Sequence, residues 1–289
     1  MLLLVPADPL RPARPDEHFA AEARAARDAG VVVAVVDHDV LARGGDVDRA
    51  VAKVPVDDDA VYRGWMLRSE HYAGFVEALA RRGVAVRTDA ERYRRAHELP
   101  GWYEALAGVT PESVWTVGAG RAEFDAARSA LGAGAAVLRD YTKSMKHHWH
   151  EAALLPDLAD AEASWAVASR FLELRDDEFT GGFVLRRFER FTSAEVRTWW
   201  VDGRCVLVGP HPDTPHDVVG DPDLSAVAPL VAGLGLPFVA VDLVERSDGV
   251  WRVVELGDGQ VSDLPRTTAP AKLVEALLGQ GVQCGSRPV

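Results

Sequence analysis

Two Asp-Gly pairs, Asp202-Gly203 and Asp248-Gly249, constrain the fold of this chain more than any other feature. Each pair stands between stretches in which apolar residues alternate with polar ones, the strongest short-range indication of a β-hairpin with a two-residue turn. Because the turn sets the register, the residues that face each other across each hairpin can be predicted. The C-terminal third is therefore expected to contain antiparallel strands.

Counting back from the second turn places Asp242 directly opposite Glu255. Like charges directly opposite each other destabilise a strand pair, and these two carboxylates stand in otherwise apolar strands. A divalent cation such as Mg²⁺, which prefers oxygen ligands and usually takes one or two protein carboxylates, would neutralise them. The structural alternative is that one acid is protonated, or that both are paired with arginines such as Arg186 and Arg197.

The first hairpin places an arginine on a face that is otherwise made of bulky apolar residues. Its turn sets Arg197 opposite Val208, and Arg197 follows Glu195 on the same face. A planar guanidinium suits phosphate or carboxylate, so Arg197 is predicted to bind an anion. A structural pair of Arg197 with Glu195 or with Asp242 is the alternative.

The first hundred residues alternate strand-like and helix-like segments, which predicts a small α/β sheet domain. The run from 31 to 39 is rich in β-branched residues, as is typical of a buried parallel strand. The segment from Ser69, a plausible N-cap, to Gly83, a plausible stop, has helical spacing. The predicted strands span 2–7, 31–39, 61–67 and 84–88, and the predicted helices span 17–30 and 69–83.

A polar and aromatic connector follows and predicts a helical segment between Asp89 and Thr110, with a break at Pro100-Gly101. The remainder combines helices with a block of antiparallel strands, so the fold class is α/β (α+β), with a domain boundary near residue 110. The predicted elements are strands at 113–118 and 135–140, helices at 122–132 and 158–179, an antiparallel block from 182 to 256, and a C-terminal helix at 269–281.

Length, charge and cysteine content limit the classes of function. A chain of 289 residues with 48% hydrophobic content is long enough for two compact domains. Cys205 and Cys284 are too few for a disulfide framework, no basic leader precedes the first strand, and no apolar run approaches the roughly 20 residues of a membrane span. The net charge of -12 disfavours a general nucleic-acid binder. We expect a cytoplasmic protein with small partners.

Five separated segments resemble one protein family in their order along the chain. They are VLRDYTKSMKHHW from residue 137, FVLRRF from residue 183, an E-x-R strand, VAVDLVE, and VVELGDGQVSDLP. Together they resemble the ATP-grasp superfamily, most closely its clade named for two arginines and a lysine. The resemblance covers roughly Val61 to Pro265, and its strongest motifs follow Ala136.

The resemblance implies a set of nucleotide-binding residues. A basic residue on the strand before a flexible loop contacts the phosphates in this family; Arg139 stands at that position, where lysine is usual, and Lys143 and Lys146 follow in the loop. A solvated basic loop is the alternative. The strand from residue 183 matches the linker between the two lobes, which implies that Leu185 and Phe188 flank the adenine ring.

The same resemblance implies which residues are catalytic. Arg186 and Arg197 match the two arginines of the clade, and with Lys143 they are expected to offset the charge of a transferred phosphoryl group or acyl phosphate. The loop from about Tyr141 to Trp149 is expected to be mobile without nucleotide and to close over it.

The metal site implied by the resemblance contains Asp242 and Glu255, the two residues that the hairpin register places face to face. The family motif continues with Asn where this chain has Gly257. Asp258 or Gln260 is the candidate for the remaining ligand, and the choice between them stays open.

By resemblance, the chain is an ATP-dependent carboxylate-amine ligase that uses Mg²⁺ and ATP and forms an acyl phosphate. The implied organisation is a pre-ATP-grasp domain at 1–110 and an ATP-grasp domain at 111–289, with lobes at about 111–183 and 184–289. Its expected substrates are small-molecule or peptide carboxylates and amines. Phosphoryl transfer, nucleic-acid end ligation and ATP binding without catalysis are the alternatives that the same fold allows.

Three further positions have weaker indications of function. The histidines His147, His148 and His150 lack an established metal-ligand spacing and are expected at a partly exposed helix start. His211 could face a nucleotide cleft or be structural. Arg63 follows a predicted strand, where open α/β sheets bind ligands, although packing is the simpler expectation.

Overall fold

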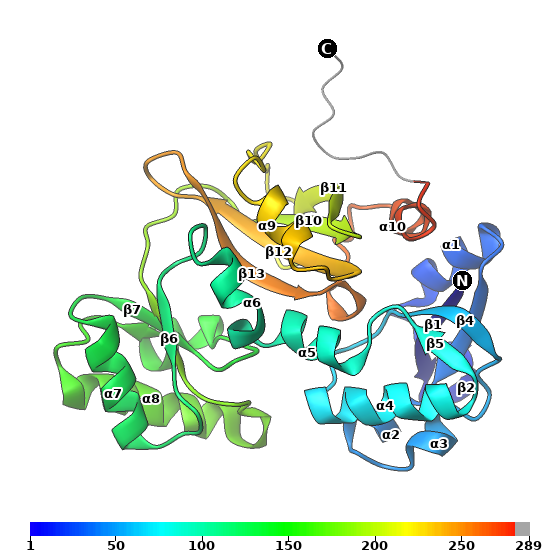
Figure 1. Cartoon of the computed structure of the whole chain (residues 1–289), viewed down its shortest axis with the longest axis horizontal. Helices are drawn as coiled ribbons and strands as arrows, with labels where there is room; N and C mark the ends of the chain where they lie inside the picture. Colours follow the sequence, from blue (N-terminus) through cyan, green and yellow to red (C-terminus); the bar gives the residue numbers. More distant parts are fainter. Residues whose placement is uncertain (281–289) are drawn as a thin grey trace.

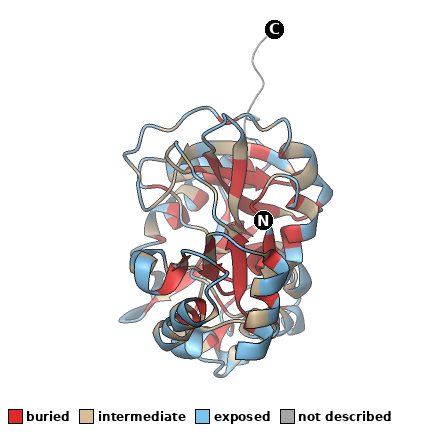
Figure 2. Cartoon of the chain, turned by 90° about the vertical axis from the view of Figure 1, so that its left-hand side faces the viewer, coloured by how far each residue is buried: buried red, intermediate tan, exposed pale blue. Residues whose placement is uncertain are grey.

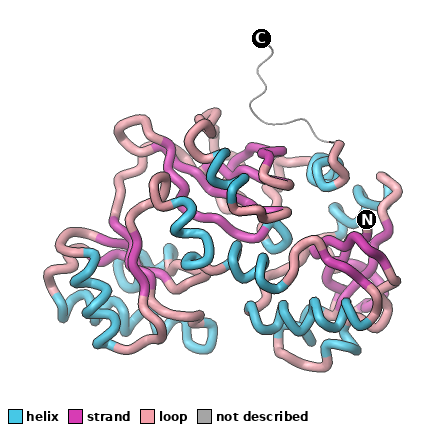
Figure 3. The backbone as a smooth tube through the Cα atoms, in the orientation of Figure 1, coloured by secondary structure: helices cyan, strands magenta, loops and turns pink. Residues whose placement is uncertain are grey.

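A computed structural model describes residues 1–280 and shows a mixed α/β protein, which confirms the predicted fold class. Three sheets form within these residues (Figure 1). The N-terminal sheet lies on the right of Figure 1, a second sheet on the left and the C-terminal sheet at the top. Figure 3 shows the same arrangement, with helices covering the outer sides of the left and right parts.

The N-terminal sheet contains parallel strands in the order β3-β1-β4-β5, and β2 pairs antiparallel with the end of β1. Four helices accompany it. The strands are β1 Leu2–Asp8, β2 Arg11–Pro15, β3 Val32–Val36, β4 Asp57–Tyr62 and β5 Val84–Val86, and the helices are α1 Ala20–Asp28, α2 His38–Ala42, α3 Val47–Ala50 and α4 Ser69–Arg81.

Three predictions for this sheet require correction. β3 is an edge strand and not a buried one, because it pairs with β1 at the margin of the sheet and Val32 is exposed. The next predicted strand ends early, at Tyr62, so the residues after it form a loop. Ser69 begins α4, but its hydroxyl donates to Glu98 Oε1 (2.7 Å) and does not cap the helix.

Two helices, α5 (Ala90–His97) and α6 (Leu99–Leu106), form the connector. They break at Glu98, which has an extended backbone, and Pro100 lies in the first turn of α6, where no backbone N–H is needed. The break thus comes before the predicted Pro100-Gly101. Trp102 packs in the same core cluster as the C-terminal sheet. The domain boundary near residue 110 stays a proposal, and this packing favours one closer to α5.

The second sheet is antiparallel, in the order β6-β9-β7-β8, and the helices α7 and α8 pack against it. Phe124, Phe171 and Phe183 contribute to the hydrophobic cluster between helices and sheet. Its elements are β6 Ser113–Trp115, α7 Arg121–Leu131, β7 Ala136–Arg139, β8 Leu154–Leu155, α8 Ala161–Arg175 and β9 Val184–Arg187.

The C-terminal sheet is antiparallel, in the order β11-β10-β12-β13. One face packs against α6 and α9, and part of the other face packs against α1, α10 and β1. Figure 2 shows the buried residues gathered along the strands, with exposed residues on the surrounding helices and loops. The elements are β10 Val196–Val201, β11 Arg204–Pro210, α9 Ala228–Gly233, β12 Phe238–Glu245, β13 Trp251–Asp258 and α10 Pro270–Leu277.

The two hairpins confirm the central register prediction and correct a second one. Asp242 pairs with Glu255 as predicted, although the loop has three residues, closed by Arg246 N–H to Val250 O (2.9 Å), and a bulge follows Asp242. The longer loop and the bulge shift the register in opposite directions and cancel. In the first hairpin a single bulge is not compensated, so Arg197 pairs with Gly209 and not with Val208.

A segment that directly follows β13 fastens the N-terminal sheet to the C-terminal sheet. Gln260 is fully buried; its side chain accepts from Tyr62 N (3.0 Å) and donates to Tyr72 Oη (2.8 Å), and its carbonyl accepts from Gly64 N (3.0 Å). Arg63 donates to the carbonyl oxygens of Gly259 and Ser262. The contact between the N-terminal sheet and the segment after β13 is therefore rich in buried hydrogen bonds.

Arg63 is also half of a buried ion pair. Its guanidinium donates to both carboxylate oxygens of Glu22 (2.7 and 2.8 Å), lies over the ring of Trp199, and is 1% exposed. The packing role expected for Arg63 is thus what the structure shows.

The remaining sequence expectations concern the termini and the cysteines. Cys205 is buried on β11, and Cys284 lies outside the described residues. The predicted C-terminal helix is α10, and the end of its predicted range, at residue 281, also lies outside them. Within residues 1–280, no helix has the length and apolar character needed to cross a bilayer.

We expect Arg63→Met to lower the free energy of unfolding by about 3–5 kcal/mol, because Glu22 would remain buried without its cation. Urea denaturation followed by circular dichroism would measure the loss. Arg81→Met is the matched control, since Arg81 pairs with Asp48 on the surface and removal of an exposed pair costs at most about 1 kcal/mol. Equal, small losses of unfolding free energy for both variants would contradict the stabilising role of the buried Arg63–Glu22 pair.

Candidate functional site

A cavity of about 490 Å³ lies where the loop after β4, the loop after β7 and one face of the C-terminal sheet come together. The loop after β4 contributes Gly64, Trp65 and Met66. The remaining wall comes from His97, the loop residues 142–144, 146 and 147, Arg197, the loop segment 211–213, the β12 and β13 positions 240, 242 and 255–258, and residues 261–263. Most of the polar residues singled out in the sequence are therefore brought to one place.

Asp242 and Glu255 lie on the floor of this cavity, on the same face of β12 and β13. Asp242 is 2% exposed, so its charge needs a partner. Arg197 on β10 supplies it: Nε and Nη2 donate to the two oxygens of Asp242, both at 2.7 Å. The predicted alternative, a structural Arg197–Asp242 pair, is thus present in the structure.

Glu255 faces cations that come from the second sheet. Burial alone would raise its pKa, but the positive charges of Arg139, Lys143 and Arg197 outweigh burial and hold the pKa at about 2. Arg139 Nη2 lies 3.6 Å from Glu255 Oε1 and also donates to Thr142 O (2.9 Å). Glu255 is therefore ionised at neutral pH, as a metal ligand must be.

Arg186 is buried beside Arg139 and has no carboxylate partner among residues 1–280. It donates to Val254 O (2.5 Å) and Thr110 Oγ1 (2.7 Å), and its Nε has no hydrogen-bond partner. Burial, followed by the charge of Arg139, lowers the pKa of Arg186 to about 9. Two neighbouring buried guanidiniums with an unsatisfied N–H favour an anion at this position.

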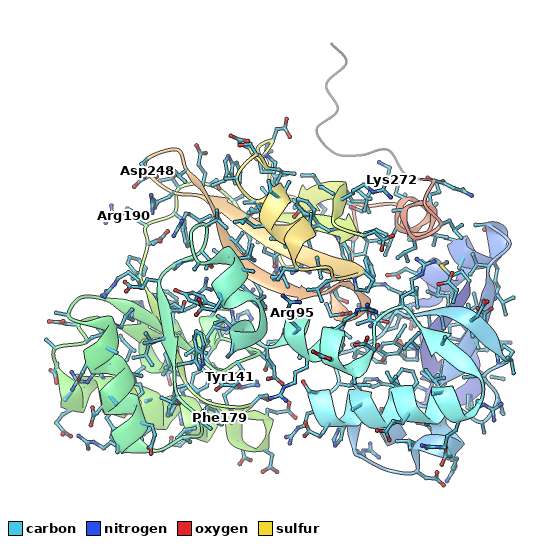
Figure 4. All side chains as sticks on the ribbon, in the orientation of Figure 1. Arg95, Tyr141, Phe179, Arg190, Asp248 and Lys272 are labelled. Atoms are coloured by element: carbon cyan, nitrogen blue, oxygen red, sulfur yellow. The ribbon has the colours of Figure 1, made fainter. Side chains whose placement is uncertain are left out.

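The loop after β7 is fixed at its start and exposed further along. Asp140 Oδ1 accepts from Thr142 N (2.8 Å) and Lys143 N (2.7 Å), and Oδ2 accepts from Arg175 Nε (2.9 Å). Tyr141, labelled in Figure 4, is buried and donates to Thr116 O (2.7 Å). These hydrogen bonds favour a mobile segment that begins after Lys143 and not at Tyr141.

Lys143 and Lys146 are both exposed in this loop and line the cavity. Lys146 forms an ion pair with Asp213, which belongs to the loop after β11 and also lines the cavity. The role of both lysines in binding phosphate stays a prediction.

The two apolar residues that were predicted to flank the adenine ring, Leu185 and Phe188, lie in different surroundings. Leu185 is fully buried in the cluster between β9 and the helices α7 and α8, and it does not line the cavity. The reason is strand alternation, which turns Leu185 away from the face that carries Arg186. Phe188 is 42% exposed, and its ring lies 6.3 Å from that of Trp149. Phe188 does not line the cavity either, but its ring is accessible, so Phe188 and not Leu185 is retained as a candidate for contact with adenine.

Asp258 and Gln260 do not complete the carboxylate pair. From Glu255 to Asp258 the pairing with β12 is regular, so Asp258 lies on the opposite face of β13. Asp258 accepts from Gln260 N (2.9 Å), and burial raises its pKa to about 7. The side-chain oxygen and nitrogen of Gln260 are already hydrogen-bonded to Tyr62 N and Tyr72 Oη. Neither residue is retained as a third ligand.

Glu195 and His211 are closer to Asp242 than the sequence indicated. Ligand atoms of these three residues lie within 4.8 Å of one another, and this is the group in residues 1–280 with the spacing of a metal site. Burial, then the charges of Asp242 and Glu255, raise the pKa of Glu195 to about 8. His211 lines the cavity, one of the two roles predicted for it.

The histidines of the loop and connector differ in position. His147 and His148 belong to the short helical turn Lys146–His148, and His150 belongs to the next turn, Trp149–Ala153. His147 also lines the cavity. His97 was not a sequence candidate, yet it lines the cavity from α5. Burial, then Lys143, lowers its pKa to about 4, so it is neutral. No sequence pattern separates His97 from other helix residues.

The donor set fits a nucleotide with a divalent cation. Carboxylate oxygens of Asp242 and Glu255 are hard ligands of the kind that Mg²⁺ prefers. Arg139, Arg186 and Lys143 supply more positive charge than Glu255 offsets, and the buried Nε of Arg186 is unsatisfied. A bound anion would pair with the arginines and the lysine, and a cation bound to that anion would pair with the two carboxylates.

Comparison with solved structures shows the same fold at low sequence identity. A RimK domain protein ATP-grasp from Sphaerobacter thermophilus is 19% identical, with a TM-score of 0.62 over 96% of this chain and 99% of that one. The D-cycloserine synthetase DcsG is 19% identical, with a TM-score of 0.59 over 96% and 99%. The ATP-grasp ligase PsnB, complexed with minimal precursor, Mg and ADP, is 13% identical, with a TM-score of 0.57 over 96% and 97%.

No curated protein matches the sequence. The model of one family does, over residues 130–277, which is just over half of the chain and includes the loop after β7 and the whole C-terminal sheet. It describes an ATP-grasp domain, the third family of the clade named for two arginines and a lysine. The resemblance to that clade is thus confirmed, and the chain belongs to this third family of its ATP-grasp domains.

Proposed function

We propose that this protein is an ATP-dependent carboxylate-amine ligase that uses Mg-ATP and forms an acyl phosphate. One observation carries the proposal: a single cavity joins the carboxylate pair Asp242–Glu255 to the phosphate-directed cations Lys143, Lys146 and Arg197. Membership of the ATP-grasp family supports the same activity.

Asp242 and Glu255 would hold Mg²⁺, which neutralises phosphate oxygens and orients the nucleotide when bound. Lys143 and Lys146 lie on the loop at the cavity entrance and would bind the phosphates from that side. Arg139 and Arg186 are fixed by hydrogen bonds to backbone and hydroxyl oxygens, so their donors are positioned before any ligand binds.

The proposed reaction proceeds in two steps. A substrate carboxylate oxygen attacks the γ-phosphorus of ATP, the bond to the bridging oxygen breaks, and ADP leaves. An amine then attacks the acyl carbon, inorganic phosphate leaves, and the amine loses a proton as the amide forms. Arg197 would offset the charge of the transferred phosphoryl group, and the protein contributes mainly position and electrostatics.

The similar structures support two substrate classes. PsnB is described with a precursor peptide, and DcsG is a synthetase of the small molecule D-cycloserine. We propose a peptide or small-molecule carboxylate and an amine for this chain, bound where Trp65 and Met66 of the N-terminal domain border the cavity.

Incubation with Mg-ATP and pooled carboxylates, amino acids and peptides should release ADP and phosphate in step with a product whose mass is that of its two substrates less one water. Mass spectrometry would identify the product. Mg-ATP alone should raise the melting temperature, since ligand at 100 times its Kd stabilises the folded state by about 2.7 kcal/mol. AMP and pyrophosphate as products would exclude the acyl-phosphate route, and an unmoved melting curve would exclude nucleotide binding.

Glu255→Gln should abolish most turnover and weaken Mg-ATP binding by at least the roughly 10–100-fold that loss of an outer-shell partner costs a metal site. Calorimetric titration with a non-hydrolysable ATP analogue and Mg²⁺ would measure the affinity. Glu77→Gln is the matched control, because Glu77 is exposed on α4. A Glu255→Gln protein that folds and keeps full affinity would refute the metal role.

Mg-ATP should slow amide hydrogen exchange in the loop from Ser144 to His148 but leave Tyr141 and Thr142 unchanged. The first part of the loop is already held by Asp140, whereas the later part carries the exposed Lys146. Mass spectrometry of exchanged peptides with and without nucleotide would test this. Equal protection of both segments in the two states would rule out closure of the loop.

A further inference from the structure

Arg197 is the cation at the centre of a group of potential metal ligands. Its guanidinium donates to both oxygens of Asp242 (2.7 Å each), and Nη2 lies 3.0 Å from His211 Nε2. Glu195 completes the group, since its carboxylate oxygen lies 3.9 Å from His211 Nε2. One arginine thus contacts two of the three residues whose ligand atoms cluster within 4.8 Å.

The direction of the His211 lone pair follows from its contacts. A guanidinium can only donate, so the contact with Arg197 requires a lone pair on Nε2. The backbone N–H of Asp213 also approaches the ring, at Nδ1 (3.2 Å), and a neutral imidazole cannot accept at both nitrogens. The charged donor is nearer and forms the stronger bond, which leaves Nε2 as the acceptor, directed at the centre of the group.

Glu195 has no arginine or lysine within ion-pair distance among the described residues; its one such contact is with His211. Asp242, the imidazole and Glu195, whose raised pKa leaves it mostly protonated at neutral pH, therefore share a single cation, Arg197. A divalent ion in place of the guanidinium would displace the Glu195 proton and give all three side chains a ligand bond.

We propose that Glu195, His211 and Asp242 form a second divalent-cation site, which Arg197 fills while no nucleotide is bound. The imidazole ligand makes this site favour Mn²⁺ or a similar transition ion over Mg²⁺. The inference extends the proposed function, because Asp242 is also assigned to the Mg²⁺ of the nucleotide. Arg197 leaves Asp242 when a phosphoryl group offers it another anion, and the second cation then enters.

Nucleotide-free protein titrated with Mn²⁺ and followed by electron paramagnetic resonance tests the site directly. Arg197→Met should bind Mn²⁺ at least about tenfold more tightly than the wild type, the equivalent of about 1.4 kcal/mol. The bound Mn²⁺ should show coupling to a histidine ¹⁴N nucleus. Adding His211→Gln should abolish that coupling, whereas adding His216→Gln, an exposed histidine of the same loop, should not. Unchanged affinity in Arg197→Met, or no ¹⁴N coupling, would overturn the proposal.

A second measurement covers the case in which Arg197→Met fails to fold. Wild-type protein with Mn²⁺ and a non-hydrolysable ATP analogue should show ¹⁴N coupling that is lost in His211→Gln and kept in His216→Gln. Coupling to ³¹P without histidine ¹⁴N would overturn the second site and leave the nucleotide site intact. Absence of any thermal shift with the analogue would instead refute the proposed function.

Discussion

The direct opposition of Asp242 and Glu255 is the constraint on which the rest of the site depends. Two carboxylates across a strand pair repel each other, and here they lie on one face at the floor of a cavity. Arg197, from the neighbouring strand, neutralises Asp242, and Arg139, from the second sheet, approaches Glu255. Those arginines come from different sheets. Neutralising the two carboxylates therefore requires both sheets to border the cavity.

The charges around this pair are balanced only in part. Arg186 lies next to Arg139 with an unsatisfied Nε, while Glu195 lies next to Asp242 without a lysine or arginine partner in the described residues. An excess of cations near Glu255, and beside Asp242 a Glu195 carboxyl group whose pKa is raised to about 8, suit a ligand that is itself an ion pair, because its cation can displace the Glu195 proton. A nucleotide phosphate with a divalent cation has this character, and neither ion alone would satisfy both sides.

The strand that carries Glu255 also determines where the N-terminal domain sits. β13 runs directly into the segment that contains Gln260, whose side chain accepts from the backbone of β4 and donates to α4. Arg63 anchors the next loop to the same segment through two backbone carbonyls. These buried hydrogen bonds fix the position of Trp65 relative to the carboxylate pair. A fixed distance suits a site where two substrates must be held close together.

Local patterns in the sequence were enough to predict the two hairpins and the longer helices. The pairing of Asp242 with Glu255 was also predicted, although from a two-residue turn where the structure has a three-residue loop. Alternation alone would also have separated Asp258 from Glu255, because three residues along a strand change the face. It could not supply the bulges: two offsets cancel at Glu255, whereas one uncompensated bulge moves Arg197 from Val208 to Gly209.

Which anion each arginine meets, and that His97 reaches the cavity, follow from the assembled fold and not from local patterns in the sequence. These outcomes depend on segments far apart in the chain, and hydrophobic period and turn chemistry describe only near neighbours. A buried charge takes the partner that packing brings within reach, so its role is settled by the assembled fold.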